Sequence, residues 1–182
     1  MQPTAPDTMF LAKLVPHPQV IQGPIAELTV MLERQGDVLW LRYVAEGDVD
    51  AVDWPDDQPG GRADRLWEHT CFEVFIETAD GYREFNLSPS GQWAAYSFTA
   101  YRQGMVDAIE TARIAGLDGA EGMVALEAFI PLPPSPGRLA LAAVIEALDG
   151  SKTYWALAHP SDKPDFHHPD SFTLVLPAPE QS

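Results

Sequence analysis

The stretch between residues 66 and 98 constrains the fold of this chain most strongly, because it predicts three consecutive strands separated by turns. The predicted strands cover residues 71–77, 82–87 and 92–98, with a Ser-Pro-Ser-Gly turn before the last. Apolar residues alternate with other residues along them, which is typical of β-structure. One face is aliphatic and aromatic, whereas the other carries polar groups that include Glu73, Glu84 and Asn86. A sheet face of the second kind suits a sugar or another small polar ligand.

The rest of the chain shows the same alternation between turn residues. Further strands are predicted over residues 25–33, 38–44, 123–130, 154–158 and 171–176. Residues 139–148 are rich in alanine, which favours a helix, but their place between a proline-rich segment and a turn favours a buried strand. Residues 106–115 fit either a short helix or an irregular strand. Roughly eight or nine strands are enough for two packed antiparallel sheets.

We therefore predict an all-β fold, a two-sheet antiparallel β-sandwich of jelly-roll or immunoglobulin-like type. The length of 182 residues and a hydrophobic fraction of 46% suit one domain with a single core. That domain is expected to span residues 1–182, with its core at about residues 25–176.

Charge and composition exclude several classes of partner. The chain has 11 basic and 27 acidic residues, a net charge of −16, and its basic residues are scattered. Binding to a nucleic acid requires clustered lysine and arginine, so no nucleic-acid partner is expected. No segment approaches the roughly 20 apolar residues that a membrane-spanning helix needs, so no membrane partner is expected either.

Cysteine usage and the first residues bear on compartment. Cys71 is the only cysteine, so no intramolecular disulfide can form. The first residues lack the basic start and apolar stretch of a signal peptide. A cytoplasmic location is therefore expected.

Two of the five tryptophans are candidates for stacking on a ligand. Trp67 precedes the strand at residues 71–77, and Trp93 follows the Ser-Pro-Ser-Gly turn. An exposed indole ring stacks well on the apolar face of a sugar ring. Core packing is the alternative role for any tryptophan, and we expect it for Trp40 and Trp155.

Polar candidates lie near Trp67 in the sequence. Glu68, Glu73, Glu84 and Asn86 would share a sheet face if the strands at residues 71–77 and 82–87 are neighbours. Carboxylates and amides on such a face can orient sugar hydroxyls. The alternative is a solvated outer face, on which arginines such as Arg102 pair with the acids at little energetic consequence.

The segment 159–170 concentrates three histidines, three aspartates and three prolines. Histidine and aspartate can bind zinc or a similar metal, although the spacing matches no established zinc pattern. A second interpretation is a loop at the rim of a ligand pocket, with His159, Asp165 and His167 over the ligand. A third is that the histidines only hydrogen-bond the backbone and hold the turn into the last strand.

The order of these motifs resembles the DOMON-like domains, relatives of the family nine carbohydrate-binding modules. The resemblance covers residues 25–176, and its specific part is Phe-Glu-Val-Phe-Ile at residues 72–76, Glu-Phe-Asn at 84–86 and Ser-Pro-Ser-Gly at 88–91. It implies a β-sandwich that binds sugar or haem without catalysis. Sugar-binding members hold a saccharide end between two tryptophans, for which Trp67 and Trp93 are the candidates here. Family nine modules often hold calcium, and haem-binding relatives use Met and His as axial ligands.

The sequence as a whole favours noncatalytic binding of a small polar ligand, a carbohydrate, with no resident cofactor. The expected ligand-binding residues are Trp67, Glu68, Glu73, Asn86, Trp93, Arg102, His159, Asp165 and His167. One alternative is a haem protein, with Met31, Met105 or Met123 and His69 or His159 as axial ligands. A second alternative is a metal-assisted hydrolase with its site in the segment 159–168.

Overall fold

The computed structural model describes residues 9–20 and 22–176, and over these it consists of strands and three 3-10 helices. The strands are β1 (Phe10–Pro16), β2 (Ile25–Gln35), β3 (Val38–Gly47), β4 (Gly61–Arg62), β5 (Cys71–Thr78), β6 (Gly81–Leu87), β7 (Gln92–Phe98), β8 (Val106–Asp107), β9 (Arg113–Ala120), β10 (Met123–Pro131), β11 (Arg138–Glu146), β12 (Lys152–Ala156) and β13 (Leu174–Val175). The 3-10 helices are η1 (Val49–Ala51), η2 (Leu66–Glu68) and η3 (Pro169–Ser171). Within the described residues, no helix is long and apolar enough to cross a membrane. The all-β prediction is confirmed.

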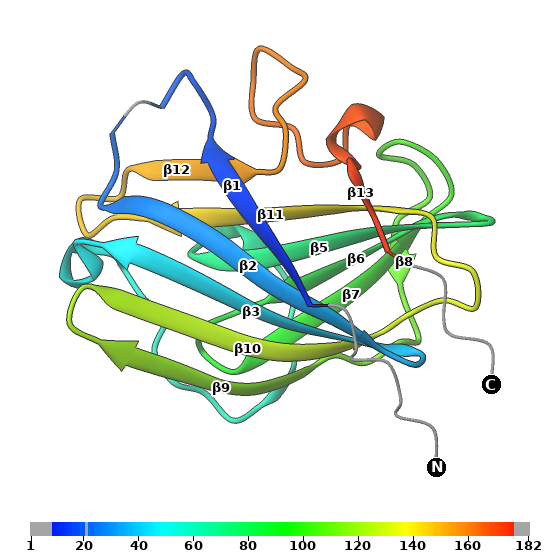
Figure 1. The fold of residues 1–182 in the computed structure, drawn as a ribbon, viewed down its shortest axis with the longest axis horizontal. Helices are drawn as coiled ribbons and strands as arrows, with labels where there is room; N and C mark the ends of the chain where they lie inside the picture. The colour runs from blue at the N-terminus through cyan, green and yellow to red at the C-terminus, as the bar shows by residue number, and fades with distance from the viewer. Residues whose placement is uncertain (1–8, 21, 177–182) are drawn as a thin grey trace.

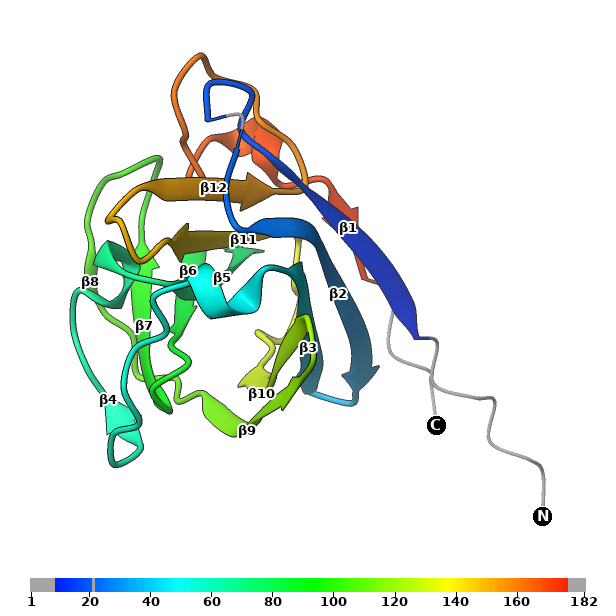
Figure 2. The same ribbon diagram turned by 90° about the vertical axis from the view of Figure 1, so that its left-hand side faces the viewer.

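The strands form one curled sheet (Figures 1 and 2) in the order β4-β7-β6-β5-β11-β12-β1-β2-β3-β10-β9, with β8 paired to β7 and β13 to β11. The predicted sandwich of two separate sheets is not confirmed, because β1 hydrogen-bonds on both sides. Its residues from Phe10 to Leu14 pair with β2, and Val15 and Pro16 pair with β12. The two halves of the expected sandwich are therefore joined through β1.

The interior of the curl holds the main hydrophobic core. We call the side of the sheet that lines it the inner face. Phe72, Val74 and Ile76 from β5 are fully buried there, opposite residues such as Leu41 from β3. The alternation predicted for residues 71–77 is thus confirmed, because every second side chain of β5 enters this core.

The other side of β5, β6, β7, β11 and β12, which we call the outer face, is also covered. Phe75, Tyr82, Phe98 and Phe172 form a second hydrophobic cluster on it, against which Trp67 packs. The covering segments are η2, the loop 99–105 and the loop 159–172. The polar side of β5 and β6 is therefore buried, rather than the solvated surface that was one of the alternatives.

The ambiguous segments resolve as strands. Residues 139–148 form most of β11, and residues 106–115 contain β8 and the start of β9 without a helix. Three strands escaped prediction: β1, the two-residue strand β4, and most of β9. On β1 the outward side chains Leu11 and Val15 are themselves apolar and exposed, which hides the alternation, and β9 contains Gly116 and Gly119 with few buried side chains.

A candidate ligand pocket on the outer face of the sheet

A cavity of about 370 Å³ lies between the outer face and the segments that cover it. Its floor comes from five strands: Glu73 (β5), Glu84 (β6), Phe98 (β7), Val144 (β11) and Tyr154 (β12). Its walls come from the covering segments: Trp67, Arg102, Met105, Pro164, Phe166 and His167. We call this cavity the outer pocket. Its size, its mostly apolar lining and its few convergent polar groups are typical of small-molecule sites.

The strand register brings the polar floor residues together. β5 and β6 are antiparallel neighbours in which Glu73 lies opposite Asn86 and Phe75 lies opposite Glu84. Alternate residues share a face, so Glu73, Glu84 and Asn86 all point outward, as the sequence predicted. The Asn86 side-chain nitrogen donates to Glu84 Oε1 at 3.1 Å, whereas the buried Asn86 Oδ1 has no hydrogen-bond partner among the described residues.

Both carboxyl groups of the floor have raised pKa values. Burial is the main reason that the pKa of Glu73 lies well above its usual value, and the nearby charge of Glu84 adds to it. Burial likewise raises the pKa of Glu84 to about 7, although the hydrogen bond from Asn86 and the charge of Arg102 act in the opposite direction. Both groups can therefore change their protonation when a ligand enters.

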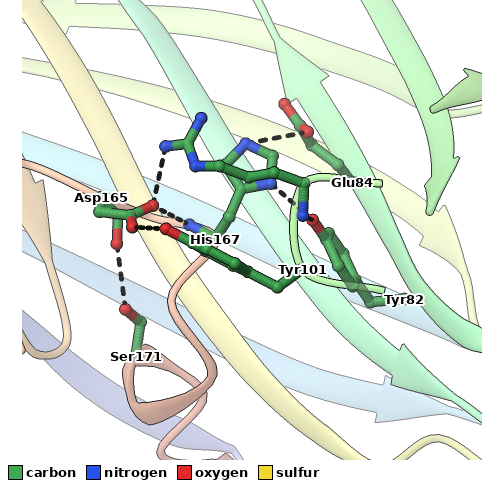
Figure 3. Close-up of polar contacts among 7 residues, drawn as sticks. Tyr82, Glu84, Tyr101, Asp165, His167 and Ser171 are labelled. Atoms are coloured by element: carbon green, nitrogen blue, oxygen red, sulfur yellow. Dashed lines mark hydrogen bonds and ion pairs between the residues drawn. The ribbon is translucent and has the colours of Figure 1, made fainter. Parts of the chain in front are cut away.

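His167 joins Glu84 to a chain of hydrogen bonds (Figure 3). The Arg102 backbone N–H donates to the Tyr82 hydroxyl at 3.2 Å, and that hydroxyl lies 2.8 Å from His167 Nδ1. Burial, followed by the charge of Arg102, lowers the pKa of His167 to about 4, so its ring is neutral at pH 7. Because the tyrosine hydroxyl accepts from Arg102, we assign its proton to the bond with Nδ1 and the imidazole proton to Nε2, which lies 3.7 Å from Glu84 Oε2.

Asp165 ties the two covering loops together (Figure 3). Its carboxylate accepts hydrogen bonds from the Tyr101 hydroxyl, from Arg102 Nη2 at 2.8 Å and from the His167 backbone N–H at 3.2 Å. Ser171 Oγ donates to its backbone carbonyl at 3.3 Å. Burial alone would raise the pKa of Asp165, but the hydrogen bonds from Tyr101 and Arg102 lower it below its usual value. The loop 99–105 is thereby fixed to the loop 159–172 above the outer pocket.

The structure brings together five of the nine predicted ligand-binding residues at the outer pocket, with a sixth behind its wall. Trp67, Glu73, Arg102 and His167 line the pocket. Asn86 is the fifth: it does not line the pocket itself, but it is fully buried beside it and donates a hydrogen bond to the lining residue Glu84. Asp165 is the sixth, since it holds Arg102 in the wall.

The other three predicted residues lie elsewhere. Trp93 packs against the main core on the inner face, and the guanidinium of Arg62 lies 4.8 Å from its ring. Alternate residues of β7 face opposite sides of the sheet, so Trp93 faces away from Tyr96 and Phe98. The expected arrangement of a ligand between Trp67 and Trp93 must therefore be corrected. His159 is also outside the pocket.

Glu68 and His159 have structural partners instead. Glu68 Oε1 accepts from Arg65 Nε at 2.9 Å and from Nη2 at 2.6 Å. His159 Nε2 lies 2.8 Å from the Val15 carbonyl, and its ring contacts His17 edge-on. The interpretation that some histidines hold the backbone thus applies to His159.

Several pocket residues were missed by the sequence reasoning. Phe98 and Tyr154 lie on strands that were predicted, and correct pairing of those strands would have placed both on the outer face. Phe166 belongs to a loop whose position no local pattern reveals. Met105 was considered only as a haem ligand.

The segment 159–168 does not form a metal site in the described part of the chain, where no group of three or more His, Cys, Asp or Glu residues is arranged to hold an ion. The reason is visible in the contacts. Asp165 is engaged by Tyr101 and Arg102, and His168 Nδ1 accepts from the Asp170 backbone N–H at 3.1 Å. The alternative of a metal-assisted hydrolase depended on these residues as metal ligands, and the structure does not arrange them as such.

Comparisons with known proteins add a likeness of fold. Neither a protein-family model nor a curated protein sequence matches the chain. The fold is similar to the crystal structure of a Bacteroides uniformis protein that is named as a candidate carbohydrate-binding protein. The TM-score is 0.62, the sequence identity 18%, and the match covers 90% of this chain and 84% of that chain. The outer pocket thus lies on a fold that is shared with a protein of that description.

Proposed function

We propose that this chain is a noncatalytic carbohydrate-binding protein and that the outer pocket receives the sugar. The observation that carries the proposal is a small cavity in which aromatic rings face a pair of buried carboxyl groups. The similar fold of a candidate carbohydrate-binding protein supports it. The DOMON-like resemblance of residues 72–91 points in the same direction and remains part of the proposal.

The lining divides into two kinds of contact with a sugar. The rings of Trp67, Tyr154 and Phe166 offer apolar faces for the C–H side of a pyranose ring. Glu73 and Glu84 offer acceptors for its hydroxyls, and Arg102 offers N–H donors. This division matches the amphipathic character of a monosaccharide.

Trp67 provides the test of this proposal. We expect Trp67→Ala to raise the dissociation constant for a bound sugar about tenfold or more, since a stacking contact contributes about 1 kcal/mol beyond its buried area. Calorimetric titration of monosaccharides and disaccharides measures the change. Trp93→Ala is the matched control, because it removes an indole from the opposite face and should leave affinity within about twofold. Equal loss in both variants, or no sugar binding by the unmodified protein, would refute the proposal.

Haem binding is a second candidate, because Met105 and His167 both line the outer pocket. These are a Met and a His, the residue types that serve as axial ligands in haem proteins. The His69 and His159 candidates lie outside the pocket. Titration with haem, followed by the Soret band in the unmodified protein and in Met105→Leu, tests this candidate.

A further inference from the structure

Glu73 is a buried carboxyl group without a partner. The residue is 3% exposed and lines the outer pocket. Its side chain makes no hydrogen bond and no ion pair with any residue in the ranges that the structure describes. A buried ionisable group normally has such a partner, because burying it alone is costly. The missing partner is therefore expected to come from a ligand.

In the part of the chain that the structure describes, the outer pocket has no free cation to balance its two carboxyl groups when they ionise. Glu73 and Glu84 both face the cavity, and the one guanidinium in its lining, that of Arg102, is already paired with Asp165 at 2.8 Å. His167 contributes no positive charge at neutral pH, since its pKa is about 4. Two carboxyl groups thus meet in one cavity with no free cation beside them among the described residues. The net charge of −16 further attracts cations to the molecule.

The aromatic lining of the outer pocket also favours a cation. Trp67 and Phe166 lie in its walls, and Phe98 and Tyr154 lie in its floor. The faces of aromatic rings carry partial negative charge, so they attract an ammonium group that has been removed from water. Rings and carboxylates around one cavity together form a site for an organic cation.

We infer that the outer pocket recognises a ligand with a positively charged amino group, specifically an amino sugar, whose ammonium group is bound by Glu73 and Glu84. This inference rests on the proposed function, since it names the class of sugar for the same site. The ammonium group would supply the partner that Glu73 lacks and would balance the charge of Glu84. The sugar ring would lie against the aromatic walls.

A protonated carboxyl pair is the competing arrangement. A neutral Glu73 could donate to the unpartnered Oδ1 of Asn86, its cross-strand neighbour, and the pocket would then prefer neutral sugars. The two arrangements differ in proton release. An ammonium ligand stabilises the ionised carboxylates and expels protons, whereas a neutral sugar leaves the protonation unchanged.

Calorimetry can separate these arrangements. Glucosamine, glucose, N-acetylglucosamine and cyclohexylamine are titrated at about pH 7 in two buffers of different ionisation enthalpy, which reveals proton release. We expect glucosamine to bind at least about tenfold tighter than either neutral sugar, with release of protons. We also expect Glu73→Gln to remove this preference, because the variant can no longer supply the carboxylate that binds the ammonium group.

Two further variants complete the design. Glu84→Gln repeats the test at the second carboxyl, so a folding defect in either variant does not leave the inference untested. Glu77→Gln is the charge-matched control on the same strand, because Glu77 is ion-paired with Arg138 away from the pocket. Its preference for glucosamine should equal that of the unmodified protein.

The ligand panel distinguishes failure of the inference from failure of the proposed function. Equal affinity for glucosamine and glucose would overturn amine recognition and leave carbohydrate binding intact. Binding of cyclohexylamine without any sugar would overturn carbohydrate binding and, with it, the amino sugar, and would leave a site for a simpler amine. If none of the four compounds binds, both are overturned.

Discussion

Burial determines the chemistry of the two carboxyl groups in the outer pocket. Glu84 is only 4% exposed, and its side chain shares the outer face with Glu73. A buried carboxylate loses its hydration, so the protonated form is favoured and the pKa of Glu84 rises to about 7. The charged or titratable groups that interact with it are Cys71, Glu73, Tyr82, Tyr96, Arg102 and His167.

A pH-dependent stability follows from the raised pKa of Glu84. Its usual pKa is 4.5, so between pH 4.5 and about 7 the folded state holds a proton that the unfolded state has released. The contribution to stability is therefore complete below pH 4.5 and is lost as pH rises through 7. We expect the free energy of unfolding of the wild type, relative to Glu84→Gln, to fall by at most about 3 kcal/mol over that range.

Urea unfolding at about pH 5 and about pH 7.5 measures this difference. The comparison with Glu84→Gln is needed because His167 acts in the opposite direction. Its pKa is lowered from 6.5 to about 4, so its contribution to stability is lost as pH falls through that range. The wild-type curve alone would mix the two effects. A difference between the two proteins that does not vary with pH would contradict the prediction.

At the scale of elements, the hairpin between β5 and β6 holds the two carboxyl groups in register. Thr78 lies opposite Gly81 at its end, and Gly81 has a φ of +140°, a conformation that other residues rarely adopt. A Cβ atom there would collide with the backbone carbonyl of Phe98 in β7. The close approach of β6 and β7 therefore requires glycine at this position.

Gly81→Ala is expected to destabilise the protein by about 2 kcal/mol or more, since it adds both backbone strain and a collision with rigid backbone. Gly36→Ala is the matched control. Gly36 also has a positive φ, +66°, but a Cβ atom there would have no neighbour within 4 Å. Its cost should be about 1 kcal/mol, the strain alone. Urea unfolding measures the loss of stability in both variants. Equal losses would contradict the prediction, because they would show that the backbone shifts and relieves the collision.

Elements differ in how much of them the sequence could reveal. The strands β5, β6 and β7 were predicted because most of their inward residues are apolar, and that alternation also placed Glu73, Glu84 and Asn86 on one face. The error over Trp93 arose because no local pattern says which side of an isolated strand faces a cavity. It was the pairing of Trp93 with Leu87 that assigned it to the inner face.

At the scale of the whole molecule, the outer pocket is assembled from segments far apart in the chain. Trp67, Arg102 and His167 come from three separate covering segments, and Asp165 joins two of them. Such long-range contacts leave no periodic signal, which is why the sequence predicted polar candidates but not the cavity. The continuity of the sheet was missed for a similar reason, since it depends on β1 pairing with both β2 and β12.

A hydrogen bond across the interior connects the two halves of the curled sheet behind the outer pocket. The Tyr43 hydroxyl on β3 donates to the backbone carbonyl of Glu73 on β5 at 2.8 Å, and Tyr43 is fully buried. This bond fixes the backbone that carries the carboxyl group in the pocket floor. It also crosses the core directly, whereas the sheet connects the same strands only through β1.

We expect Tyr43→Phe to lower the free energy of unfolding by about 1 kcal/mol, the usual contribution of one hydrogen bond, with packing of the ring retained. If the halves unfold together, the urea midpoint falls and the slope m stays unchanged. Tyr154→Phe is the control, because the Tyr154 hydroxyl makes no hydrogen bond within the described ranges, and its midpoint should not move. A reduced slope or two transitions in Tyr43→Phe would mean that this bond, rather than β1, couples the halves.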